Sequence, residues 1–396
     1  MVIGTANVLL GVAIAMRVDA SRDVWWLWTW THTWLQGTNP YRWPIPADYP
    51  PWALVALSPV GVVPDAALPV LWACAGVSLA IAVAWVGPKA IAIQSPPLRL
   101  TIGLFLSWAA VRYGLGNGQF ALLSVASGLA AVWLARNGSA WSGLFLAAAL
   151  VKPHVGMAFL AWAFVAAKWR AIAGAAAALA AATVVFSVRL GESVVATLVQ
   201  YMGQVGAELG GAEPLRGTVE MRPLLEAITG DPAVAAILNT TLAVAGFAAI
   251  VWAVSRHPSD TRGELALPLF CLWTLASTFH NAYDLVLVWP VWLVLWHRQQ
   301  HDPRQSPYLL AFVQAALVVG VPGLWWKLHG SGFGLHFDRV LLAGLLIYML
   351  AAARGLLRRP VFGEVHRREP VQAAARHPSE VMLPQPRASA GRVAQQ

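Results

Sequence analysis

The chain has 396 residues, of which 58% are hydrophobic and only 11% are charged. Because soluble domains carry roughly 25% charged residues, this composition excludes an ordinary water-soluble protein and indicates an integral membrane protein. The net charge of +9 does not indicate nucleic-acid binding, since eight of the 27 basic residues lie in the segment 354–396. We interpret that segment as a disordered cytoplasmic tail behind a membrane domain over residues 1–353.

Apolar runs separated by short polar breaks recur along the chain, and each approaches the length that crosses a bilayer. The sequence therefore predicts an all-α polytopic membrane protein with about 10–12 transmembrane helices. The first run lacks a basic n-region and a small-residue cleavage site, so we expect a retained helix and not a cleaved signal peptide. The predicted segments cover residues 2–16, 66–87, 99–112, 119–135, 139–151, 153–167, 171–190, 235–255, 264–279, 284–297, 307–323 and 338–353.

Basic residues fill alternate breaks between these segments, which places those breaks and the tail in the cytoplasm. The external face then receives two long loops, residues 17–65 and 191–234. In the first loop, Trp26, Trp30 and Trp34 recur every four residues, which predicts an amphipathic helix over 22–36 lying flat at the membrane interface. The following proline-rich stretch cannot remain helical and is expected to form an ordered loop.

Polar side chains near apolar segments are costly, and several gather on the predicted external face. Asp23 opens the 22–36 helix. Asp23 is a candidate N-cap of this helix and also a candidate general base. The two roles are compatible because a helix N-terminus keeps a carboxylate ionised, and an ionised carboxylate can accept a proton. Asp19 lies closer to the first membrane segment and is the weaker candidate for a base.

Three further cations are candidates for binding an anionic substrate. Lys152 and His154 flank a proline within an apolar run. Lys152 is either a lysine that snorkels from a helix end or a phosphate ligand, with His154 as a hydrogen-bond donor. Arg112 precedes a glycine-rich turn that ends at Gln119, and its guanidinium suits a bidentate phosphate contact.

The motif HNAYD places His280 and Asp284 four residues apart, on one face of a helix. They form either a satisfied polar pair at a membrane boundary or part of a catalytic site. No HExxH, paired-cysteine, P-loop, GxSxG or GxGxxG pattern is present, and the external acids are not clustered like metal ligands. The sequence therefore predicts no metal and no cofactor.

The order of these motifs resembles a known family. An aspartate opening an external helix is followed by GTNPY, YPP, NGQF, KPHVG and STFHNAYDLVLVWP between residues 23 and 290. This order is similar to glycosyltransferase family 87, membrane enzymes of the GT-C superfamily that include polyprenol-phosphate-mannose-dependent mannosyltransferases. Val24 follows the aspartate where an aromatic residue is usual, and residues 217–225 match the family's polar motif only loosely.

The resemblance implies a GT-C fold, a polyprenyl-phosphate sugar donor, a lipid or glycan acceptor, and catalysis at the external, periplasmic face of the plasma membrane. It gives Asp23 the role of general base in an inverting transfer of a hexose, expected to be mannose. The predicted substrate-binding residues are Tyr49, Arg112, Gln119, Lys152, His154, His280 and Asp284. The alternatives are a multi-pass transporter or flippase, for which polar residues on one membrane face are also expected, and another GT-C-like lipid-linked transferase.

Overall fold

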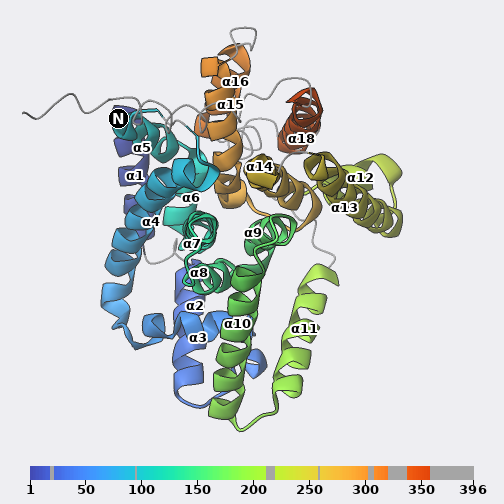
Figure 1. The fold of residues 1–396 in the computed structure, drawn as a ribbon. Coiled ribbons are helices and arrows are strands. Elements are labelled where there is room, and N and C mark those ends of the chain that lie inside the picture. Colours follow the sequence, from blue (N-terminus) through green and yellow to red (C-terminus); the bar gives the residue numbers. More distant parts are fainter. Residues whose placement is uncertain are drawn as a thin grey trace, which may run out of the picture.

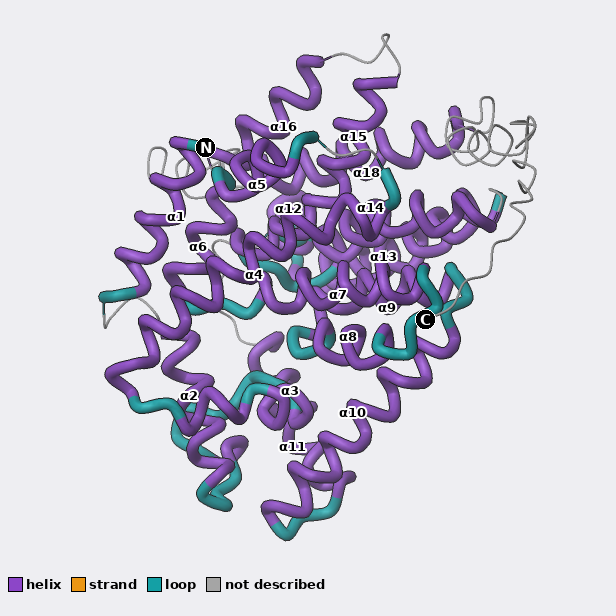
Figure 2. Tube along the Cα trace, turned by 60° about the vertical axis from the view of Figure 1, so that its left-hand side comes forward, coloured by secondary structure: helices purple, strands orange, loops and turns teal. Residues whose placement is uncertain are grey.

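The computed structural model describes residues 1–17, 22–93, 96–210, 219–256, 259–301, 307–319 and 337–356. Within these ranges every regular element is a helix (Figures 1 and 2), which confirms the predicted helical membrane fold. The predicted tail lies outside the described residues except for 354–356, which end the last helix. The N-terminal helices are α1 (Val2–Ala15), α2 (Arg22–Leu35), η1 (Pro40–Arg42), α3 (Pro51–Ala56), η2 (Ser58–Val62), η3 (Asp65–Ala67), α4 (Leu68–Ile91), α5 (Leu98–Leu106), α6 (Ala109–Asn117) and α7 (Ala121–Arg136).

The second half of the chain continues the same pattern of long and short helices. Its elements are α8 (Ser142–Ala149), α9 (Pro153–Val165), α10 (Trp169–Leu190), α11 (Val194–Gly210), α12 (Arg222–Thr229), α13 (Pro232–Ser255), α14 (Ser259–Ser277), η4 (Ala282–Val288), α15 (Trp289–His301), α16 (Pro307–Val319) and α18 (Phe337–Leu356).

Three helices of the described chain are long and apolar enough to cross a membrane. They span Asp65–Ile91, Trp169–Leu190 and Pro232–Ser255, and the pair α6 and α7, bent by 117°, would add a fourth. Five shorter apolar helices, such as Val2–Ala15 and Pro153–Val165, fall at segments that the sequence predicts to be transmembrane. The number of 10–12 crossings includes these shorter helices and stays a prediction.

Two breaks between helices shape the centre of the bundle. Gly118 ends α6 with a left-handed φ of 72°, a conformation that glycine adopts without steric cost, and the chain turns sharply into α7. Helix α8 ends at Ala149, and α9 begins at Pro153, a residue well suited to the first helical turn. The two breaks place the buried polar side chains of Gln119 and Lys152 inside an otherwise apolar region.

The tryptophan-rich helix α2 packs into a separate hydrophobic cluster at one end of the molecule (Figure 1), which we call the tryptophan lobe. The lobe comprises residues 22–63, the C-terminal part of α10 and α11. Trp34 is only 5% exposed, stacks on Phe186 of α10 at 5.6 Å between ring centroids and donates from Nε1 to its carbonyl oxygen. Trp30 is also 5% exposed and contacts Tyr49.

The burial of these indoles corrects one detail of the sequence interpretation. The helix over 22–36 is present, but Trp30 and Trp34 face the protein and not a membrane surface. Two indole N–H groups of α2 find acceptors in the segment that follows it: Trp30 donates to the carbonyl of Ile45 in the proline-rich loop, and Trp28 donates to that of Val63 after η2. The tryptophans therefore fix α2 to the loop that follows it.

Candidate active site

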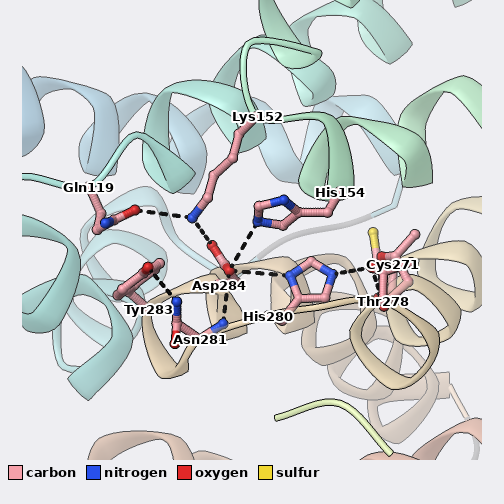
Figure 3. Close-up of polar contacts among 10 residues, drawn as sticks. Gln119, Lys152, His154, Cys271, Thr278, His280, Asn281, Tyr283 and Asp284 are labelled. Atoms are coloured by element: carbon pink, nitrogen blue, oxygen red, sulfur yellow. Dashed lines mark hydrogen bonds and ion pairs between the residues drawn. The ribbon is translucent and has the colours of Figure 1, made fainter. Parts of the chain in front are cut away.

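Lys152 is the centre of a buried polar network at the break between α8 and α9 (Figure 3). It is 5% exposed, and its Nζ donates to Asp284 Oδ1 at 2.7 Å and to Gln119 Oε1 at 3.1 Å. The ammonium also lies 4.3 Å from the ring centroid of Tyr283, a distance typical of a cation–π contact. A buried lysine with these three partners does not snorkel to a surface, so the snorkelling interpretation of Lys152 is wrong and its role as a phosphate ligand stays a prediction.

Asp284 is fully buried and receives contacts from four sides. Besides the bond from Lys152, its Oδ2 accepts from the backbone N–H of Asn281 at 3.1 Å and lies 3.3 Å from His280 Nδ1 and 3.6 Å from His154 Nε2. A buried carboxylate is stable when a cation and hydrogen bonds compensate its lost hydration. Lys152 supplies that cation, so the two groups form an ion pair.

The HNAYD motif adopts a different local structure from the predicted α-helical face. Asn281 is the N-cap of the 3-10 helix η4, and Asn281 and Asp284 form a capping box. His280 precedes the cap, and its ring nevertheless reaches the Asp284 carboxylate. The side chain of Asn281 in turn donates to the Tyr283 hydroxyl at 2.6 Å. The predicted contact between His280 and Asp284 is therefore present, although it is formed at a capped 3-10 helix and not along the face of an α-helix.

Gln119 reaches the network because Gly118 lets the chain turn directly against α2. A Cβ atom built on Gly118 would lie 2.8 Å from both the backbone nitrogen and Cβ of Val24. Val24 follows Asp23, which lies in the first turn of α2, after its first residue Arg22, and not at the cap. The turn that carries Gln119 thus contacts the helix turn that carries Asp23.

Two tyrosines connect the Asp23 side of the site with the Asp284 side. The pKa of Tyr49 is raised well above its ordinary value by burial, and the charges of Asp48, Asp23 and Asp284 add to this. The pKa of Tyr283 is raised by burial and then by Asp284, Asp23 and Asp48. Because each tyrosine responds to all three carboxylates, Asp23, Asp48 and Asp284 lie around one region.

The predicted site residues fall into three groups. Gln119, Lys152, His154, His280 and Asp284 form the contact network, although they are far apart in sequence. Asp23 and Tyr49 border it; Tyr49 packs edge-on against Phe120. Arg112 is turned toward α1, where its Nη1 donates to Asn7 Oδ1 at 3.2 Å. Asp19 lies outside the described residues.

Sequence reasoning missed four polar residues that the structure places at or beside this network. Asn281 and Tyr283 lie inside the HNAYD motif, between the two residues that were selected. Thr278 lies two positions before the motif, and its Oγ1 is 3.0 Å from His280 Nε2. Asp48 precedes Tyr49 in the proline-rich loop. Their position next to selected residues was the available signal.

The comparisons with known proteins identify the family but no individual relative. The profile of Glycosyltransferase family 87 matches residues 48–278, which is more than half of the chain. The match includes Gln119, Lys152 and His154 and ends two residues before His280. No curated protein and no solved structure matches the chain. With its helical membrane architecture and this match, the chain belongs to glycosyltransferase family 87, a membrane family of the GT-C type, and is a multi-pass membrane glycosyltransferase that acts on a sugar donor and an acceptor.

Proposed function

We propose that the protein transfers a hexose, expected to be mannose, from a polyprenyl-phosphate donor to a hydroxyl group of a lipid or glycan acceptor. The transfer takes place at the external, periplasmic face of the membrane and inverts the anomeric carbon, with Asp23 as the general base. One observation carries this proposal: the first turn of α2, which holds Asp23, contacts the turn that leads through Gln119 to the buried Lys152–Asp284 pair.

The division of charge around the site supports two separate roles. Asp23 is half-buried, whereas Asp284 is fully buried and paired with Lys152. A carboxylate that is already held by an ammonium and a backbone N–H is a poor proton acceptor. Asp284 is therefore a positioning residue that orients Lys152 and the histidines, and the resemblance to the family gives the role of base for the acceptor hydroxyl to Asp23.

The proposed reaction requires only one base. The acceptor oxygen attacks the anomeric carbon as its proton passes to Asp23, and the bond between that carbon and the phosphate oxygen breaks with its electrons on the phosphate. A phosphate leaving group needs little protonation, whereas inverting hydrolases of glycosidic bonds use a second carboxylic acid to protonate the leaving oxygen.

Lys152 supplies positive charge and N–H donors for the departing phosphate. An ammonium has three N–H donors, and the described bonds to Gln119 and Asp284 use two of them. The pairing with Asp284 means that Lys152 acts as an oriented donor more than as an uncompensated charge. The structure shows the Arg112 side chain hydrogen-bonded to Asn7 and not to the network around Lys152. Its contact with the donor phosphate therefore stays a prediction.

The transporter and flippase alternatives do not explain membership of a glycosyltransferase family. The sugar and the lipid carrier of the donor come from the resemblance to mannosyltransferases of this family, and the predicted periplasmic side comes from the basic cytoplasmic breaks. These finer features are therefore the part of the proposal that most needs an experiment.

The test is reconstitution of the full chain in liposomes with radiolabelled donors. Polyprenyl-phosphate mannose, polyprenyl-phosphate glucose and GDP-mannose are each supplied with a membrane-lipid extract as acceptor. We expect label to appear in acceptor lipids only with a polyprenyl-phosphate sugar. Equal transfer from the nucleotide sugar would overturn the lipid-phosphate donor, and transfer of glucose but not mannose would overturn the sugar.

A further inference from the structure

The side chains of His154, His280 and Asp284 bring three ligand atoms together with a spacing that suits a metal ion (Figure 3). His280 Nδ1 and His154 Nε2 lie 3.3 Å and 3.6 Å from Asp284 Oδ2, and all three ligand atoms lie within 4.8 Å of one another. Ligands that bind zinc tetrahedrally at about 2.0–2.1 Å are separated from each other by roughly 3.3–3.4 Å. Two of the three separations are close to that value.

We propose that His154 Nε2, His280 Nδ1 and Asp284 bind a divalent transition-metal ion whose open coordination position takes a phosphate oxygen of the sugar donor. The proposal rests on the proposed function for the identity of that last ligand. It departs from the sequence-based expectation of no metal, since from the sequence alone His280 and Asp284 lacked the further ligands that a zinc site needs. His154 and His280 are 126 positions apart, so no local sequence motif could include both.

The hydrogen bonds around His280 turn its Nε2 toward Thr278 and its Nδ1 toward Asp284. The hydroxyl of Thr278 donates to the carbonyl of Thr274 at 3.0 Å, and its oxygen also lies 3.0 Å from His280 Nε2. A hydroxyl has one hydrogen, so in this arrangement Nε2 of His280 carries the N–H and Thr278 accepts it. The ring then presents its other nitrogen, Nδ1, to Asp284 Oδ2 at 3.3 Å, which is the atom that would bind an ion shared with that carboxylate.

His154 provides a second, independent observation. Its Nε2 is a buried atom that makes no hydrogen bond of normal length among the described residues; it lies 3.6 Å from Asp284 Oδ2, and Figure 3 shows the ring turned toward that carboxylate. Buried polar atoms in proteins are almost always satisfied, by protein groups, water or ions. Coordination to an ion shared with Asp284 and His280 would satisfy this nitrogen in the position where the structure places it.

The surroundings resemble the outer shell of a metal site. Metal-binding histidines usually donate their other N–H to an oxygen, and metal-binding carboxylates are themselves hydrogen-bonded. Thr278 takes the first role for His280, and Lys152 and the Asn281 backbone take the second for Asp284. Two nitrogens and one carboxylate oxygen suit zinc, cobalt or manganese better than magnesium or calcium, which prefer oxygen ligands alone.

The charge balance connects the metal to catalysis. Lys152 already neutralises Asp284, so a divalent ion with two neutral histidines gives the site two uncompensated positive charges. The phosphodiester of the donor carries one negative charge, and the released polyprenyl phosphate carries close to two. The ion therefore stabilises the products and the transition state leading to them more than the bound donor, which is how a Lewis acid accelerates such a step.

The first experiment measures metal binding by the purified full-length chain in detergent. After treatment with a chelator and dialysis, the protein is titrated with Zn²⁺ and with Co²⁺, and bound metal is measured by mass spectrometry and by the visible d–d bands of cobalt. We expect about one ion per chain with tetrahedral-type cobalt bands. His154→Gln should weaken binding by roughly 100-fold or more, and His154→Cys should retain it because thiolate is also a ligand.

The control is His32→Gln, which changes a histidine of α2 that is hydrogen-bonded to the Gly61 carbonyl, outside the cluster. It should bind as the wild type does. Wild-type protein without a stoichiometric ion, or equal binding by His154→Gln and wild type, would overturn the metal site. Because His154 is partly exposed, its variants should remain folded, which the unchanged helical circular dichroism will verify.

A transfer assay separates failure of the metal site from failure of the proposed function. If the protein without a bound ion still transfers sugar from a polyprenyl-phosphate donor at an unchanged rate, the metal site is refuted and the proposed function stands. If one ion binds at the cluster but no polyprenyl-phosphate sugar supports transfer, the metal site is supported and the proposed donor is refuted. Loss of transfer on chelation, with recovery on adding Zn²⁺ or Co²⁺, is the result that we expect.

Discussion

The contact between Gly118 and Val24 gives a direct way to move Asp23 without changing it. In Gly118→Ala, the new Cβ would lie 2.8 Å from the Val24 backbone nitrogen, at least 0.6 Å inside the 3.4 Å of an ordinary contact. Because the nearest atoms are Val24 Cβ and backbone, the first turn of α2 must shift by about that amount. A misplacement of roughly 1 Å can cost about 100-fold in rate, so we predict that kcat falls by about 10-fold or more.

The matched control is Gly138→Ala. Gly138 has the same φ of 72° as Gly118, but a Cβ built there meets nothing within 4 Å. Both substitutions therefore share the cost of placing alanine in the left-handed region, about 1–2 kcal/mol, and only one disturbs the site. The assay compares kcat for sugar transfer and the thermal stability of both variants. Equal kcat values for Gly118→Ala and Gly138→Ala would refute the positional link between this turn and Asp23.

Three further predictions concern stability. Lys152→Met should lower stability by about 3–5 kcal/mol because it leaves the Asp284 carboxylate buried without its ammonium. The double variant Lys152→Met/Asp284→Asn should lose no more stability than either single variant. Additive losses in thermal melts in detergent would contradict the pairing. Trp34→Ala should cost about 3–5 kcal/mol through loss of its stacking on Phe186, and a melting temperature equal to wild type would exclude that packing role. Burial raises the pKa of the Glu220 carboxyl above 4.5, so the folded state binds this proton more tightly than the unfolded state, and stability falls as pH rises through the raised pKa. Glu220→Gln should flatten that decline in thermal melts between about pH 4 and 7. An unchanged slope of stability against pH would contradict this prediction.

The helices could be predicted from the sequence because their signals are local. Apolar runs, the proline at the start of α9 and the glycine after α6 each act within a few residues. The direction of the tryptophan face could not be predicted in the same way. Trp34 faces Phe186, 152 positions away, and a tryptophan stripe fits a protein partner as well as a membrane interface.

The residues of the contact network could largely be selected from the sequence, but their pairing could not. Lys152, His280 and Asp284 can be selected from the sequence because they are polar residues within or beside apolar segments. The ion pair between Lys152 and Asp284 joins residues 132 positions apart, and it gives the lysine an oriented, compensated role instead of a free charge. The three-residue cluster of His154, His280 and Asp284 depends on the same long-range folding.

The most direct test of the proposed mechanism is the rate of sugar transfer by Asp23→Asn under saturating donor. Asparagine keeps the size of the side chain but cannot accept the acceptor's proton, so we predict that kcat falls by about 100- to 10,000-fold while KM for the donor changes little. Asp65→Asn, at an exposed aspartate in the same predicted external loop, should retain wild-type kcat. A kcat for Asp23→Asn within about threefold of wild type would contradict the assignment of Asp23 as the general base.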